Sequence, residues 1–67
     1  MGKVMEQMTQ EDFLKKALIN EQELVRDYQN FADRTQDKDI SQVFYDWAEE
    51  DGLRANKIKQ LLEKFDQ

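Results

Sequence analysis

Residues 40–65 read ISQVFYDWAEEDGLRANKIKQLLEKF, and the apolar side chains in this stretch recur every three or four residues. That interval is typical of an amphipathic helix with one apolar stripe. The stripe consists of Ile40, Phe44, Trp47, Ile58, Leu61 and Phe65, with Val43, Ala48, Ala55 and Leu62 beside it. Charged residues interrupt it, because Asp51 and Arg54 occupy the positions between Trp47 and Ile58. The stretch therefore predicts a helix whose apolar side carries charge near its middle.

A second apolar stripe, also interrupted by a charged residue, precedes it in the chain. Glu21 takes the position between Ala17 and Leu24. Thr9 is a good N-cap, and the acidic residues that follow it suit the positive end of a helix dipole. We therefore predict a first helix over about residues 10–34, with residues 1–8 as a tail or extra helical turns. Its stripe is Phe13, Ala17, Leu24, Tyr28 and Phe31, flanked by Leu14, Leu18, Val25 and Ala32.

A short polar connection at about residues 35–38 separates the two stripes. Asp37 or Asp39 can cap a second helix over about residues 39–65. Two helices joined by so few residues are expected to lie antiparallel. Residues 9–67 should thus form one helical hairpin. Glu21 and Asp51 are equally distant in sequence from a turn centred near residue 36, so we expect them to face each other.

The size of the chain favours assembly. A chain of 67 residues buries only about 60% of the surface that its unfolded form exposes, and domains of this size usually need a disulfide, a metal or oligomerisation for stability. The sequence has no cysteine and no histidine, which leaves oligomerisation as the favoured means. Each stripe with its flank is also wider than the contact line of two helices. We therefore predict an all-α homodimer in which two hairpins form a four-helix bundle.

The net charge of −5 narrows the possible partners. Nucleic-acid binding depends on neutralising phosphates, and anionic membranes attract basic segments, so an acidic chain without a basic cluster suits neither. No apolar run reaches the ~20 residues of a membrane span. We expect a soluble, cytoplasmic protein that binds a second copy of itself or another protein.

The interrupted stripes predict a charged layer inside the bundle. Arg54 lies three residues after Asp51 and shares its helix face, so an internal salt-bridge network of Glu21, Asp51 and Arg54 is the expected arrangement. In a dimer, four carboxylates and two guanidinium groups sum to a formal charge of −2. Shared protons, water, a hydrogen bond from the Tyr28 hydroxyl or a bound cation would relieve that imbalance. Glu21 and Asp51 are the candidate metal ligands. The alternative is that these residues lie at a solvated edge or fix helix register.

These residues resemble the helix pair of rubrerythrin-type proteins in the ferritin-like superfamily. The first helix of that family carries a ligand Glu, a Tyr seven residues later and then Phe-Ala, which Glu21, Tyr28 and Phe31-Ala32 match. The second helix follows the pattern A-E-E-E-x-x-H-A-x-x-I-x-x-L-L, and residues 48–62 here read AEEDGLRANKIKQLL. The similarity covers about residues 13–65, which is half of the family's four-helix domain.

The resemblance implies a di-iron site built from a Glu and a Glu-x-x-His of each half. Glu21 matches the first ligand, Asp51 takes the place of the second Glu, and Arg54 takes the place of the His. Arginine is always protonated and cannot ligate a metal. We therefore expect a non-enzymatic homodimer without a cofactor, in which the guanidinium replaces the metal charge and the role is structural or in protein interaction. The alternatives are a protein that binds iron, manganese or another divalent metal, and a helical adaptor for a partner's helix.

Overall fold

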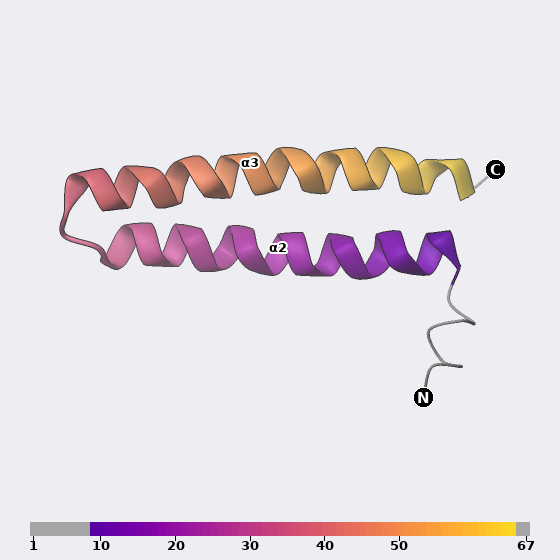
Figure 1. The fold of residues 1–67 in the computed structure, drawn as a ribbon, viewed down its shortest axis with the longest axis horizontal. Coiled ribbons are helices and arrows are strands. Elements are labelled where there is room, and N and C mark those ends of the chain that lie inside the picture. The colour runs from indigo at the N-terminus through magenta and orange to yellow at the C-terminus, as the bar shows by residue number, and fades with distance from the viewer. Residues whose placement is uncertain (1–8, 66–67) are drawn as a thin grey trace, which may run out of the picture.

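The computed structural model describes residues 9–65, which form two long helices lying side by side (Figure 1). α2 spans Gln10–Arg34 and α3 spans Lys38–Leu62, and a short 3-10 helix, η1, covers Glu63–Phe65. The chain reverses between α2 and α3, so the predicted antiparallel hairpin is confirmed. The tail or helix extension expected at residues 1–8 lies outside the described residues, as do residues 66–67.

Local hydrogen bonds explain where each helix begins. Thr9 and Asp12 form a capping box, with the Asp12 amide donating to Thr9 Oγ1 at 3.2 Å and the Thr9 amide donating to Asp12 Oδ2 at 3.1 Å. Asp37 caps α3 by accepting from the amides of Asp39 and Ile40 at 2.9 and 3.0 Å. Because Asp37 is the cap, α3 begins at Lys38, one residue before the predicted start. Its α-helical part ends at Leu62, where the last turn tightens to the 3-10 form.

The connection between the helices needs no glycine. Thr35 and Asp37 both have extended backbone angles, and no residue in the described part of the chain has a positive φ. The Thr35 hydroxyl and amide both donate to the carbonyl of Phe31, at 2.7 and 3.0 Å. Ser41 Oγ then donates to the carbonyl of Ala32 at 2.8 Å and joins the start of α3 to the end of α2. The Thr35 bonds thus close the end of α2, and the Ser41 bond holds the two helices together at the turn.

The most buried residues between α2 and α3 have mostly small side chains. The buried apolar residues in the described part of the chain are Ala32, Ala48, Ala55 and Ile58, and Asp51 is buried with them. Alanine lets the two backbones approach closely, but it buries little area. No large side chain there is fully buried.

The predicted stripes meet across the helices, but only in part. Phe13, Phe31 and Trp47 belong to the predicted stripes, yet they are 48%, 45% and 45% exposed. Ala32, Ala48 and Ala55, which flank those stripes, are buried instead. The flanking positions thus supply much of the helix contact, and the aromatic part of each stripe lies to one side of it. Between residues 9 and 65, neither helix is long and apolar enough to cross a membrane.

Candidate functional site

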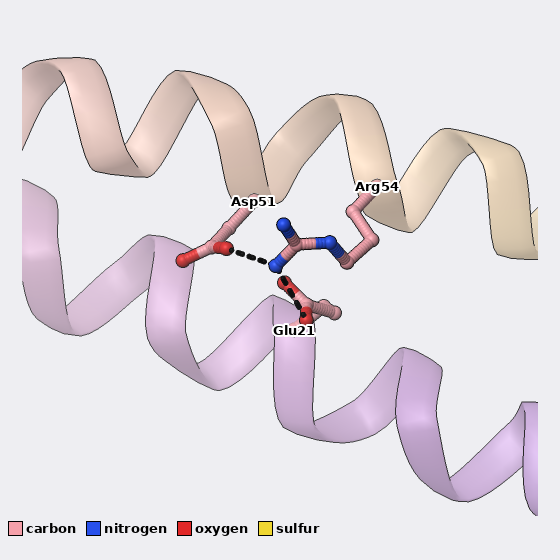
Figure 2. Close-up of polar contacts among 3 residues, drawn as sticks. All are labelled: Glu21, Asp51 and Arg54. Carbon is pink, nitrogen blue, oxygen red and sulfur yellow. Dashed lines mark hydrogen bonds and ion pairs between the residues drawn. The ribbon is translucent and has the colours of Figure 1, made fainter.

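The charged cluster, which we define as Glu21, Asp51 and Arg54, lies near the middle of both helices (Figure 2). α2 supplies Glu21, and α3 supplies Asp51 and, one turn later, Arg54. The Arg54 side chain leans back along α3 toward Asp51, which is the direction that helical side chains favour. The structure therefore brings together the three charged residues that the sequence placed in one layer.

One guanidinium nitrogen joins the two carboxylates. Nη1 of Arg54 donates to Oδ1 of Asp51 at 3.0 Å and to Oε1 of Glu21 at 3.3 Å. The second bond crosses between the helices and links α3 to α2. Because both bonds use the same nitrogen, neither pair has the two parallel bonds of a forked arginine–carboxylate pair. Within residues 9–65, Nε and Nη2 of Arg54 have no hydrogen-bond partner.

The carboxylates and the guanidinium differ sharply in exposure. The side chains of Glu21 and Asp51 are 13% and 10% exposed, whereas that of Arg54 is 59% exposed. In the single hairpin, the acids therefore lie between the helices and the arginine covers them from the solvent side. The sequence predicted an internal network, and the salt bridge is buried only on its acidic side. Arg54 lies seven residues after Trp47 and therefore on the same side of α3, beside the line of contact.

Glu21 also holds an unsatisfied atom. Its Oε2 is buried and has no hydrogen-bond partner within the described residues. An unpaired buried acceptor costs about 1–3 kcal/mol, and an ionised one costs more. The charged cluster carries a formal charge of −1, since one guanidinium faces two carboxylates. In a single hairpin, the charged cluster thus has too little positive charge to balance its carboxylates and too few hydrogen-bond donors for their oxygen atoms.

The residues present do not fit the di-iron site that the family resemblance implies. Nη1 lies between Glu21 and Asp51, where a cation shared by the two carboxylates would have to lie. No group of three or more His, Cys, Asp or Glu side chains within residues 9–65 has the arrangement of a metal site. A permanent positive charge repels a metal ion and offers it no lone pair. In one copy, Glu21 and Asp51 therefore serve as acceptors for Arg54.

The sequence also suggested Tyr28 as a hydrogen-bond partner of the charged residues. In the structure its ring stacks on Phe44, with ring centroids 6.0 Å apart, and meets the rings of Trp47 and Phe31 edge to face at 5.6 and 6.3 Å. Within residues 9–65, no hydrogen bond joins its hydroxyl to the charged cluster. Tyr28 instead belongs to an aromatic cluster that packs across the two helices.

Comparison of the chain with protein-family models, with curated proteins and with solved structures gives no match. The resemblance to rubrerythrin-type helix pairs therefore depends on the residues quoted above.

Two contacts near the turn were not anticipated from the sequence. One is the Ser41–Ala32 bond, and the other is a short hydrogen bond that the Tyr45 hydroxyl donates to Oδ1 of Asp33. This bond, then desolvation, then the Asp33 charge raise the pKa of Tyr45 above its ordinary value of 10.0. The antiparallel register that places Glu21 opposite Asp51 also places Ser41 beside residues 31 and 32. The Ser41–Ala32 contact could therefore have been predicted from the sequence. Nothing in the periodicity indicated the Tyr45–Asp33 pair.

Proposed function

We propose that this chain is a non-enzymatic assembly module that pairs with a second copy of itself through one face of the hairpin. The product is a ferritin-like four-helix bundle with the charged cluster inside it, and its task is structural or in protein interaction. One observation carries the proposal: large apolar side chains lie half exposed along a single side of the helix contact.

This apolar face contains residues from both helices at helical spacing. Its exposed members, each 41–50% exposed, are Phe13, Phe31, Ile40, Val43, Trp47 and Phe65. The two stripes lie on the same side of the helix contact, because Trp47 meets Tyr28 and Phe44 meets Phe31 across the helices. The other side is mixed, because Gln22, Gln29 and Lys59 lie there together with apolar residues such as Val25 and Leu53. Two large exposed side chains, Tyr45 and Leu53, line that side, against six on the apolar face, so the apolar face is the better candidate for burial.

The energetics of a lone hairpin support covering the apolar face. The buried apolar residues of the described chain are three alanines and one isoleucine, and each exposed large side chain of the apolar face leaves 41–50% of its area in contact with water. Burying apolar surface stabilises by roughly 25 cal/mol for each Å² removed from water. Burial of the half-exposed aromatic side chains against a partner would therefore add stabilisation that a single copy lacks.

The size of the face suits a stable dimer. Each helix has 25 residues and is therefore about 37 Å long. A face two helix diameters wide, about 20 Å, offers on the order of 750 Å². Stable protein interfaces bury about 800 Å² from each partner. A second hairpin presents an apolar face of the same length and width, so a two-fold pairing covers both at once.

Sedimentation equilibrium and thermal melting at several concentrations test this function. We expect a dimer, with a melting temperature that rises with protein concentration. Trp47→Glu should yield a monomer with a lower melting temperature, because it places a charge in the proposed contact. Leu53→Glu is the matched control: Leu53 is 65% exposed and lines the opposite side, so its dimer should persist.

A parent protein that remains a folded monomer at high concentration would contradict the proposal. That result would favour the adaptor hypothesis, in which the apolar face receives a helix of another protein. A dimer that survives Trp47→Glu and dissociates in Leu53→Glu would also contradict the proposal, because it would show that the copies meet on the side opposite to the apolar face.

A further inference from the structure

We propose that Arg54 of each copy completes the carboxylate pair of the second copy, so that the charged cluster sets the register of the dimer. This inference rests on the proposed dimer and adds the residues that align it. The occupant of the apolar face is thus a second copy of this chain, and the charged cluster is shared between the two hairpins.

The position of Arg54 makes it part of the contact. It lies between Trp47 and Leu61 at steps of seven residues along α3, and it is 59% exposed. Any partner that covers the apolar face removes water from its guanidinium. A buried guanidinium with unpaired donors is costly. Since Nε and Nη2 have no partner within residues 9–65, the covering surface must bring acceptors to this level.

A second copy brings those acceptors and gains donors in return. Oε2 of Glu21 is buried without a partner within the described residues, so its carboxyl group must rotate outward before Arg54 of the second copy can donate to it. The guanidinium groups are the most exposed members of the two clusters, while the carboxylates lie behind them between the helices. In the dimer the two guanidinium groups are therefore the nearest charges, and each needs a carboxylate of the other copy to offset their repulsion.

The position of the charged cluster along the helices makes the pairing self-complementary. Glu21 and Asp51 each lie within one residue of the midpoint of their 25-residue helix. A two-fold axis that overlaps the two hairpins along their full length therefore brings both clusters to the same level. A shift of one helical turn, about 5.4 Å, would leave each cluster facing apolar side chains. Charge burial penalises that shift, so the clusters select one register.

Exchange of charge-altered subunits tests the shared cluster. Arg54→Glu gives a cluster of formal charge −3 and Glu21→Lys gives one of +1, so the mixed dimer sums to −2, as the parent dimer does. We expect Arg54→Glu to self-associate on the order of tenfold more weakly than the parent, or worse. Mixed at equal amounts, the two variants should form more heterodimer than random exchange gives, as measured by native mass spectrometry.

Crosslinking of a nearly native chain gives an independent test. Because the sequence has no cysteine, a single introduced thiol reacts only between copies. We place it at Leu24, which is one turn after Glu21 and half-buried beside the apolar face. Ile19 is the matched control, since it lies at a similar level of α2 and is 55% exposed on the outer side. A short bismaleimide should couple Leu24→Cys into dimers and leave Ile19→Cys as single chains.

The outcomes separate this inference from the proposed function. A parent dimer with random mixing of the charge variants, or without crosslinking at Leu24→Cys, overturns the shared cluster and leaves the dimer intact. A monomeric parent overturns both. Where the charge variants fail to fold alone, recovery of helical circular dichroism on mixing supports the inference, and its absence together with no Leu24→Cys crosslink refutes it.

Discussion

Arg54 reaches across the hairpin to Glu21, with 3.3 Å between Nη1 and Oε1, although more than half of the Arg54 side chain remains exposed. The acid is withdrawn between the helices while its cation stays at the surface. An exposed ion pair contributes little in a single chain, with a typical value of about 0–1 kcal/mol. The same pair gains importance wherever a second surface excludes water from it.

Replacement of Arg54 by an uncharged residue should lower the free energy of unfolding, because the buried carboxylates of Glu21 and Asp51 would lose their donor. Arg54→Leu removes the only donor to Asp51 Oδ1 and Glu21 Oε1 within the described residues. We expect the free energy of unfolding to fall by about 1–3 kcal/mol at neutral pH, because buried acceptors lose their partner. Urea denaturation measures the loss. Arg26→Leu on the exposed side of α2 is the control, and equal stability of both variants would contradict the role of Arg54.

Gly52 should be a stabilising position for alanine. It lies inside α3, where glycine costs about 1 kcal/mol relative to alanine. A Cβ added there would meet nothing within 4 Å in the hairpin. Gly52→Ala should therefore raise the free energy of unfolding by about that amount in thermal or urea melts. A loss of stability would mean that another surface packs against Gly52 in the assembled protein.

The Tyr45–Asp33 bond predicts a dependence of stability on alkaline pH. The pKa of Tyr45 is raised in the folded chain, first by this hydrogen bond, so the folded state binds the phenolic proton more tightly than the unfolded state. Its contribution is fully present below pH 10.0 and is lost as the pH rises through the folded-state pKa.

Tyr45→Phe should abolish that part of the pH profile. Because lysines titrate in the same range, the measured quantity is the difference in melting temperature between parent and variant at each pH. The difference should shrink toward alkaline pH. Asp33→Asn keeps an acceptor without the charge and should leave a smaller dependence. A constant difference between parent and Tyr45→Phe across this range would refute the bond.

Restoring a histidine at position 54 should create metal affinity. Arg54→His removes the permanent charge between Glu21 and Asp51 and adds a nitrogen ligand three residues after Asp51. We expect zinc or manganese to raise the melting temperature of this variant more than that of the parent. Arg54→Leu serves as the control without a ligand. Equal shifts in all three proteins would argue against a degenerate metal site.

Local signals in the sequence predicted the helices well. Thr9 and Asp37 are capping residues whose effect depends on neighbours within three positions, so α2 begins and ends at the predicted residues and α3 begins within one of its predicted start. The short connection also fixed the opposition of Glu21 and Asp51, because few residues leave little choice of register. These features depend on chemistry close in the chain.

The rotation of the helices about their axes could not be read from the pattern. A stripe and its flank differ by a fraction of a turn, and either can face the neighbouring helix. Ala32, Ala48 and Ala55 are at the contact in this hairpin, and they permit a closer approach than Phe31 or Trp47 would. Arg54 lies seven residues after Trp47, so it shares the half-exposed side of α3 on which that tryptophan lies.

Trp47 is the only tryptophan of the chain, and it stands 45% exposed within the aromatic cluster. Its indole is therefore a native fluorophore at the surface where a partner is expected. Dilution of an assembled sample should shift its emission to longer wavelengths as the ring becomes hydrated, and binding of any partner over that ring should reverse the shift. The occupancy of this side of the hairpin can thus be followed optically in unlabelled protein.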